Sequence, residues 1–299
     1  MREFVIVTDS CSDMSREYRE KYNVEYIKMF YRYDDVEYPA DLDWEVHGSA
    51  KGFYDVMRAG KRIFTAQITV PMYKEAFEKW IKEGKDIIYL ACSSAFSASV
   101  KCSFTARDEL MAQYPECKIF CVDSLMACSG LFLMCKHLST MRANGVSVDE
   151  AYKWIEENKL KFHQDCCVAD LKYLKQAGRV SASSAFFGGL FQVKPIIISD
   201  AKGQNFAIEK VKGRKQSIDR IVERMKADYR PDEAFPEIVV SHADCEEDAQ
   251  YLKTQIIEKV GVKEENIIMN FFGPIIGATV GPGTMAIFYF GTEVTVNKD

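Results

Sequence analysis

The first two thirds of the chain alternate short apolar runs with segments whose apolar residues recur at helical spacing. The apolar runs predict buried strands at residues 4–7, 86–92 and 118–122, with more extended chain at 24–38 around a polar turn. The helical spacing predicts helices at residues 15–22, 44–58, 71–83, 126–144 and 148–159, and another that ends at residue 111. Strands of this apolar kind, each followed by a helix, predict a parallel sheet covered on both faces.

The pattern changes after about residue 160. Six strand-like segments follow with fewer helices between them, at residues 166–169, 195–199, 206–209, 237–241, 267–270 and 285–290. Helical spacing returns only at 217–229 and 246–261, and phenylalanine and glycine cluster at 186–189. The sequence therefore predicts an α/β protein with two domains, a parallel-sheet α/β domain at 1–160 and an α+β domain at 161–299.

Composition excludes several classes of partner. The net charge of −5 disfavours contact with nucleic acid and with anionic membranes. No apolar run approaches the ~20 residues that span a bilayer, and the first residues lack the pattern of a secretory signal, so we expect a cytoplasmic protein without membrane insertion. The 10 cysteines form no CxxC pair, which predicts reduced and mostly buried thiols rather than a metal site.

Hydroxyl-rich turns follow three of the predicted parallel strands. They contain Ser10, the serines of residues 93–99, and Ser124. Ligands of open parallel sheets bind beyond the carboxyl ends of the strands. The turn at 93–99 leads directly into a helix, whose first N–H groups favour an anion, and neutral donors of this kind suit a carboxylate at the end of an apolar tunnel. Simple capping of the helix by serine is the alternative for any one of these residues.

Other candidate residues carry weaker signals. Thr65 lies in a short polar turn between two predicted helices, and Arg179 and Arg214 follow glycines in loop-like stretches, where they could bind a phosphate or a carboxylate. The glycine-rich run at 272–283 predicts tight turns, and it is no P-loop because it lacks the Gly-Lys-Ser/Thr ending. A serine hydrolase could use Ser97 or Ser10, yet the chain has no GxSxG motif and no pattern supplies a base.

These motifs, taken in their order along the chain, resemble the DegV family of bacterial fatty-acid-binding proteins, which includes the lipid-carrying subunits of the two-component fatty acid kinase. The similarity spans almost the full length of the chain. It is carried by Val7-Thr8-Asp9-Ser10 with Ser12-Asp13, Thr65-Ala66-Gln67, residues 93–99, Val122-Asp123-Ser124, Asp170-Leu171 with Leu174-Lys175, Gly178-Arg179-Val180-Ser181, Lys194-Pro195-Ile196 and residues 277–283.

The resemblance implies a non-catalytic carrier for a long-chain fatty acid such as palmitate or oleate, with the acyl chain buried and the carboxylate near the junction of the domains. Thr65 and Ser97 match the family's carboxylate-binding threonine and serine. Arg179 matches an arginine associated with the kinase-facing end of the ligand, and Arg214 matches a second basic position. In that pathway a partner kinase, not the carrier, phosphorylates the acid with ATP.

The chain departs from the family pattern at three positions. Ala98 replaces the glycine of the Ser-Gly-Thr motif and would be strained if the backbone there required a positive φ. Ala66 lies in the threonine motif, where Thr65, the residue that contacts the ligand, is kept. Thr279 replaces a histidine before the final glycine run, and this change affects the expectation that the ligand is presented to a kinase. A serine-dependent acyl hydrolase at the same pocket and a sensor of another small acidic ligand remain alternatives.

Overall fold

The computed structural model describes residues 2–181, 193–230, 232 and 234–297. In this part of the chain a four-stranded parallel sheet has the order β2-β1-β6-β7, formed by β2 (Val24–Ile27), β1 (Phe4–Asp9), β6 (Asp86–Ala91) and β7 (Ile119–Asp123). Every residue of β1 and β6 is buried, because both faces of the sheet are covered.

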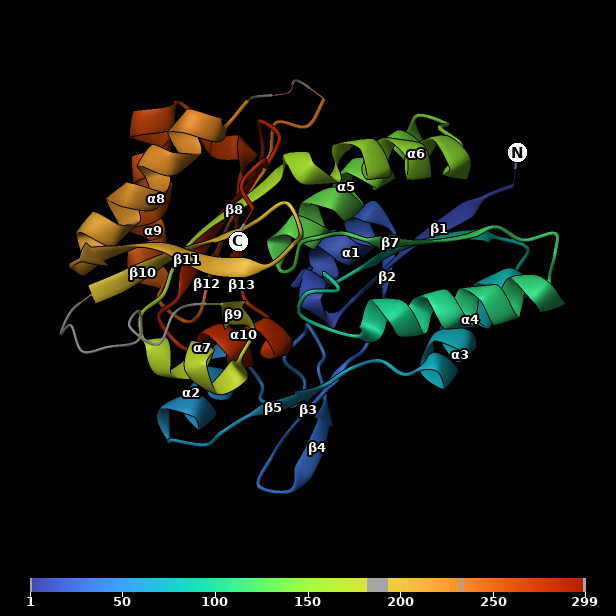
Figure 1. Ribbon diagram of the computed structural model, residues 1–299, viewed down its shortest axis with the longest axis horizontal. Coiled ribbons are helices and arrows are strands. Elements are labelled where there is room, and N and C mark those ends of the chain that lie inside the picture. Colours follow the sequence, from blue (N-terminus) through green and yellow to red (C-terminus); the bar gives the residue numbers. More distant parts are fainter. Residues whose placement is uncertain (1, 182–192, 231, 233, 298–299) are drawn as a thin grey trace.

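Helices cover this parallel sheet on both faces (Figure 1). On one face lie α5 (Ser129–Ala143) and α6 (Val148–Asn158), and on the other lie α3 (Val70–Lys82) and α4 (Ser99–Gln113). Their ends follow from the sequence. Pro71 occupies the first turn of α3, and Ser147 and Glu150 close a capping box at the start of α6. The short helix α1 (Arg16–Tyr22) packs beside α5.

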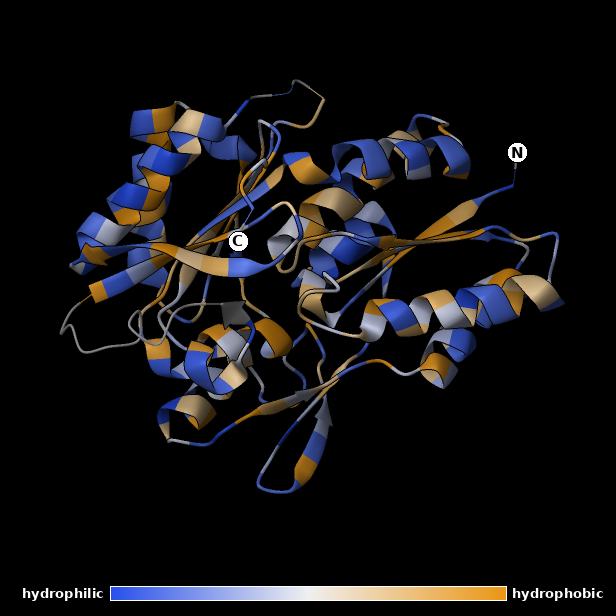
Figure 2. Cartoon of the chain, viewed as in Figure 1, coloured by the Kyte–Doolittle hydropathy of each residue, from blue (hydrophilic) through white to orange (hydrophobic). Residues whose placement is uncertain are grey.

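A second, mixed sheet has the strand order β13-β12-β14-β8-β10-β11-β9 in the described residues. Its strands are β8 (Phe162–Cys167), β9 (Val180–Ser181), β10 (Val193–Ser199), β11 (Asn205–Lys212), β12 (Ile238–His242), β13 (Ile267–Phe271) and β14 (Met285–Phe290). Helices α8 (Arg214–Asp228) and α9 (Glu246–Val260) pack on its outer face, and Figure 2 shows hydrophilic and hydrophobic residues alternating along both helices.

Helix α5 connects the two sheets, because it contacts β1 and β6 on one side and β8, β12 and β14 on the other. Its first eleven residues, 129–139, are all buried, which explains the apolar run at 131–135. Polar side chains also make contacts across this junction. Ser129 Oγ lies 2.7 Å from Ser241 Oγ, and Asn270 donates to the carbonyl of Asp13 over 2.8 Å.

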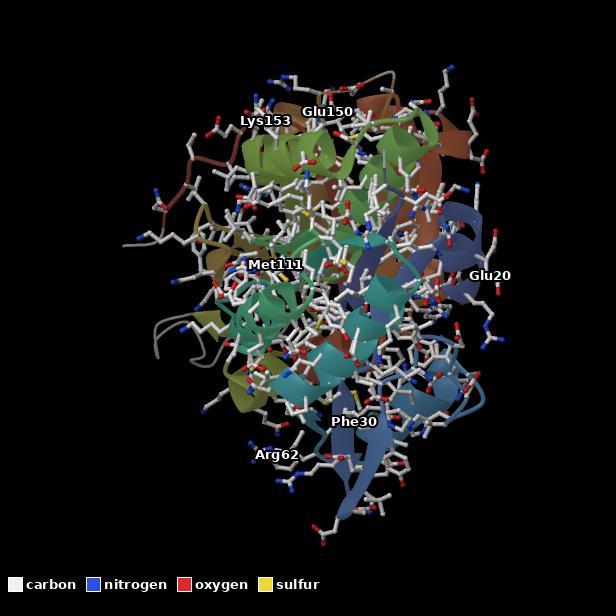
Figure 3. The ribbon with its side chains drawn as sticks, turned by 90° about the vertical axis from the view of Figure 1, so that its right-hand side faces the viewer. Glu20, Phe30, Arg62, Met111, Glu150 and Lys153 are labelled. Atoms are coloured by element: carbon white, nitrogen blue, oxygen red, sulfur yellow. The ribbon has the colours of Figure 1, made fainter. Side chains whose placement is uncertain are left out.

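A small antiparallel sheet projects from this body, at the lower end of Figure 1 and beside the labelled Phe30 and Arg62 of Figure 3. Its order in the described residues is β4-β3-β5, from β3 (Phe30–Tyr33), β4 (Val36–Pro39) and β5 (Phe64–Ala66). Next to it lie α2 (Ala50–Arg58), α7 (Leu171–Ala177) and α10 (Pro274–Val280). The remaining elements are short 3-10 turns, η1 (Ser10–Ser12), η2 (Lys159–Lys161) and η4 (Glu264–Asn266).

The predicted fold class is confirmed, with a parallel α/β sheet followed by a separate sheet-rich part. The exact boundary at residue 160 stays a prediction. The parallel sheet ends with β7 at Asp123, and the mixed sheet begins with β8 at Phe162. No helix of the described residues is long and apolar enough to cross a membrane.

Four local predictions were wrong. The helix expected at 44–58 begins only at Ala50, since Trp44 has φ 61° and Ser49 caps the N–H of Gly52. Thr65 lies in strand β5 rather than in a turn, Arg214 starts helix α8 rather than lying in a loop, and part of the glycine-rich run folds as α10. Helix α7 had no counterpart among the predicted elements. The cluster at 186–189 lies outside the described residues.

Candidate functional site

A cavity of about 300 Å³ opens beyond the carboxyl ends of β1 and β6. Strand β1 has β2 on one side and β6 on the other, so the chain changes direction across the sheet at this point, where ligands of open α/β sheets bind. The lining comes from residues that follow β1, β2, β6 and β7, from β5 and the residue after it, from the start of β11, from α10 and from the segment after α7. It comprises Cys11, Met29, Thr65, Ala66, Gln67, Cys92, Phe96, Ser97, Ala98, Ala127, Cys128, Arg179, Asn205, Ile275, Ile276, Thr279 and Val280.

The structure brings Thr65 and Ser97 to the same cavity although they lie on different elements. One hydrogen-bonded link explains their proximity. The N–H of Ile68, three residues after Thr65, donates to Ser99 Oγ over 3.2 Å, and Ser97 Oγ donates to the same Ser99 Oγ over 2.8 Å. Ser99 therefore ties the segment after β5 to the turn before α4.

The turn before α4 adopts its shape without strain. Ser97 Oγ accepts the N–H of Ser99 over 3.2 Å, and Ala98 has φ −73° and ψ −1°. This right-handed conformation suits any L-residue. The departure from the family's glycine at position 98 therefore imposes no backbone penalty.

Arg179 and Thr279 also line the cavity. Arg179 is exposed, follows the left-handed Gly178 that ends α7, and donates to the carbonyl of Ala177 over 2.5 Å. It is the one charged side chain among the lining residues that the structure describes, which favours an anionic ligand. The hydroxyl of Thr279 donates to the carbonyl of Ile275 within α10, over 3.3 Å, so this position supplies no titratable group.

Arg214 lies outside the lining of the cavity. Its guanidinium donates to Asp248 Oδ2 over 2.8 Å and to the carbonyl of Gly283 over 2.6 Å. It thus joins the start of α8, the first turn of α9 and the loop that precedes β14. The hydrogen bonds of Arg214 therefore link elements of the protein to one another.

The other two hydroxyl-rich turns are structural. Ser10 Oγ is fully buried, donates to the carbonyl of Ala40 over 2.7 Å and accepts the N–H of Met29 over 2.9 Å. Ser124 Oγ is equally buried and bonds the backbone of Met126. Both hydroxyls hold turns together and neither faces the cavity.

Sequence reasoning missed the apolar residues of the lining. Among them are Cys11, Met29, Cys92, Ala127, Cys128, Ile275 and Ile276. All ten cysteines are free and all but Cys102 and Cys245 are buried, as predicted. A hydrogen bond to Cys92 and burial raise the pKa of Cys11, and burial raises that of Cys128, so both stay neutral thiols that behave as small apolar groups. The only available signal was the position of two cysteines directly after the strand ends.

The chemistry of the lining favours binding over hydrolysis. Among the described lining residues there is no histidine, aspartate, glutamate or lysine, so Ser97 has no base there to activate it. Nor does the described part of the chain contain a cluster of His, Cys, Asp and Glu side chains suited to a metal ion. What the cavity does offer is hydroxyl donors, one guanidinium and a larger number of apolar side chains.

Comparison with known proteins agrees with this description. The family model described as the DegV family of uncharacterised proteins matches residues 3–292. The DegV domain-containing protein CPE0026 of Clostridium perfringens is 36% identical over 292 residues, which are 97% of this chain and 98% of that protein.

Solved structures share the fold at lower identity. A DegV family protein of Thermus thermophilus, described by its fatty acid binding, has a TM-score of 0.85 at 22% identity over 98% of this chain and 100% of its own. A DegV lipid-binding protein of Thermotoga maritima has a TM-score of 0.84 at 24% identity, with the same coverage of both chains. A stearic acid-binding protein of Eubacterium ventriosum has a TM-score of 0.81 at 20% identity over 96% of this chain and 98% of its own. The match of the family model along nearly the whole sequence, together with the identity to the clostridial relative, establishes that the chain belongs to the DegV family.

Proposed function

We propose that this protein binds one long-chain fatty acid, such as palmitate or oleate, in the cavity between the parallel sheet, the small sheet and α10. The observation that carries the proposal is that Thr65 and Ser97, from different elements, line one cavity together with many apolar side chains. The fatty acids bound by the structural relatives in Thermus thermophilus and Eubacterium ventriosum support the same ligand class.

The acyl chain supplies most of the binding free energy in this proposal. A tail of about fourteen methylenes gains ~0.8 kcal/mol for each group buried, which gives ~11 kcal/mol before the costs of ordering the ligand. A cavity of about 300 Å³ is at the small end of ordinary ligand pockets, so we expect side chains such as Met29 to move when a long tail enters.

The head group is held by uncharged donors. Hydroxyls of Thr65 and Ser97 each contribute about 1.5–3 kcal/mol when they bond a carboxylate. Arg179 adds positive charge at the exposed rim of the cavity and can screen the carboxylate without burying an ion pair.

Ligand retention and mutation test the proposal together. Solvent extraction of the purified protein should release a fatty acid that mass spectrometry identifies, and delipidated protein should bind added palmitate. In the Thr65→Ala/Ser97→Ala double variant the affinity should fall more than about 100-fold with the fold intact, because two bonds to a carboxylate are lost. Thr105→Ala/Thr254→Ala is the matched control, since both hydroxyls are exposed and bond only their own helices. Unchanged affinity in the Thr65→Ala/Ser97→Ala variant would mean that these two hydroxyls do not bind the fatty acid carboxylate.

We propose in addition that the bound acid is presented to a fatty acid kinase. Arg179 is a charged residue that lines the cavity and is exposed to solvent, so it is suited to contact the head group together with a partner. Incubation with ATP and a kinase subunit should yield an acyl phosphate that hydroxylamine traps as a hydroxamate. At saturating fatty acid, Arg179→Ala should reduce its formation, and equal rates would remove Arg179 from the presentation step.

A further inference from the structure

Ser97 is the first member of a row of neighbouring hydroxyls that runs from the cavity into the core. We call this row the hydroxyl relay. Ser97 Oγ lies 2.8 Å from Ser99 Oγ, the phenols of Tyr73 and Tyr89 are 2.7 Å apart, and Tyr89 donates to Asp9 Oδ2 over 2.9 Å. Ser99 adjoins the phenol of Tyr73 and lowers its pKa as a hydrogen-bond donor would, which places Ser99 between the two hydrogen-bonded parts of the row. Every member beyond Ser97 is fully buried.

The direction of the hydroxyl protons follows from the two ends of the relay. An ionised Asp9 can only accept, so Tyr89 must donate to it and must then accept from Tyr73. By the same rule Tyr73 accepts from Ser99, and Ser99 accepts from Ser97 as well as from the N–H of Ile68. With Asp9 ionised, Ser97 therefore turns its proton away from the cavity.

No cationic side chain is among the groups that act on Asp9 in the described residues. The Asp9 carboxylate accepts the N–H of Cys11 over 2.8 Å and that of Cys92 over 3.0 Å, in addition to the Tyr89 hydroxyl. In the described residues the titratable groups that face it from the neighbouring elements are thiols, phenols and one carboxyl, namely Cys11, Asp13, Tyr73, Tyr89, Cys92 and Cys135. Burial raises the pKa of Asp9, and the three hydrogen bonds oppose that rise.

A ligand carboxylate bound at Ser97 reverses the direction in which the Ser97 hydroxyl must donate its hydrogen bond. Ser97 must then point its proton to the ligand and can only accept from Ser99. If the bonds of the relay are kept, each hydroxyl in turn reverses, and Asp9 must become the donor to Tyr89. If Asp9 instead stayed ionised, two hydroxyl oxygens within the relay would face each other as acceptors with no proton between them. At a fully buried position this arrangement is unfavourable.

We propose that the cavity takes up one proton when it binds a carboxylate, and that Asp9 holds this proton at the far end of the hydroxyl relay. The inference rests on the proposed function, because it requires the head group of a fatty acid at Ser97. It makes Tyr73 and Tyr89 positioning residues for ligand binding although neither lines the cavity.

The proton step balances without any other reactant. A fatty acid that enters in its neutral form gives its proton to Ser97 Oγ as Ser97 passes its own proton to Ser99. The transfer continues through both phenols, until the ligand is a carboxylate and Asp9 a carboxylic acid. For a ligand that is ionised in solution, the same end state takes about one proton from the solvent.

Calorimetry measures this proton directly. Delipidated protein is titrated with sodium myristate at one neutral pH in phosphate and in Tris, whose heats of ionisation differ. For the wild type, the difference between the two enthalpies should correspond to about one proton taken up, and the affinity should weaken by up to about tenfold per pH unit on going to alkaline pH.

Isosteric variants interrupt the relay. Tyr73→Phe and Tyr89→Phe each remove one hydroxyl, and Ser99→Ala interrupts the same chain if a tyrosine variant is unstable. In each variant the proton uptake should fall towards zero and the dependence of affinity on pH should flatten. Tyr289→Phe is the matched control, because Tyr289 is a buried phenol that donates to the buried Asp165 over 2.8 Å in the other sheet. Its proton uptake should equal that of the wild type.

Infrared difference spectra locate the proton. Binding of myristate labelled with ¹³C at its carboxyl should produce the band of a protonated carboxyl that keeps its unlabelled position and is absent in Asp9→Asn. A band that shifts with the label would put the proton on the ligand and overturn the inference. Binding without proton uptake would also overturn it while leaving the proposed function intact, whereas failure to bind myristate at all would overturn both.

Discussion

Two aspartates, Asp9 and Asp165, are buried in the two large sheets, and only Asp165 has an arginine beside it. Each lies on a strand next to one that carries a buried tyrosine, Tyr89 in the parallel sheet and Tyr289 in the mixed sheet, and each accepts that tyrosine's hydroxyl. Asp165 also forms an ion pair with Arg224 of α8, with 2.6 Å between Nε and Oδ1. Asp9 has backbone N–H groups in place of the arginine.

The difference separates a structural carboxylate from one that can respond to a ligand. The charge of Asp165 is balanced inside the protein, so its state is set by the fold alone. The charge of Asp9 is balanced only by dipoles, and a chain of hydroxyls connects it to the cavity. A carboxylate without a counter-ion can change its protonation at low cost, which is the property that ligand-linked proton uptake needs.

Removal of the counter-ion of Asp165 should have the largest effect on stability. Arg224→Met leaves a buried carboxylate unpaired, and breaking such a pair costs about 3 kcal/mol or more. Urea denaturation at neutral pH measures this loss, which should shrink at acidic pH as Asp165 takes up a proton.

The control for this prediction is Arg220→Met on the same helix. Arg220 pairs with Glu209 and Glu223 at the surface, where an ion pair contributes less than about 1 kcal/mol. Equal losses in the two variants would mean that the Arg224 pair is no more important than a surface contact, and the contrast with Asp9 would disappear.

His137 tests whether burial without a counter-charge makes the fold sensitive to pH. It lies on α5 between the two regions, with both ring nitrogens unpartnered among the described residues and the ring 3.9 Å from that of Phe235. Burial, and then the charge of Lys136, lower the pKa of His137 well below 6.5. The unfolded chain therefore binds a proton that the folded chain refuses, and stability falls as the pH drops through 6.5.

His137→Phe removes this titration, and we expect the wild type to lose about 1.4 kcal/mol per pH unit relative to the variant, or about 2 kcal/mol at pH near 5. Denaturation of both proteins over a series of pH values isolates the contribution of His137, because the buried carboxyls cancel in the comparison. Parallel curves would show that the folded protein protonates this ring.

The smallest effect concerns the two tyrosine hydroxyls themselves. Tyr289→Phe removes a bond to a buried carboxyl group that also pairs with Arg224, which should cost about 2 kcal/mol of stability. Tyr89→Phe should cost about 1 kcal/mol, because Asp9 can relieve its charge by taking up a proton. The difference of about 1 kcal/mol is measured by thermal and urea unfolding, and an inverted order would contradict the assignment of the two aspartates.

The periodic elements were predictable because their signals are local. The strands at residues 86–92, 118–122 and 285–290 and the helices at 71–83 and 148–159 all formed within a few residues of their predicted limits. Strand β5, helix α7 and helix α10 were missed, since they are short and their positions depend on contacts with other parts of the chain.

By itself the sequence determined the alternation of strands and helices, the buried thiols and the set of hydroxyls that lie near strand ends. Apolar periodicity specifies these features, since burial acts on each segment separately. Only the tertiary structure decided which hydroxyls share a cavity. Ser10 and Ser97 both lie in polar turns that follow a predicted strand. The hydroxyl of Ser10 is hydrogen-bonded to the backbone of Ala40 and Met29, whereas Ser97 lines the cavity. The relay from Ser97 to Asp9 was equally invisible, because its links join residues up to 80 positions apart through side chains that only the folded sheet brings into contact.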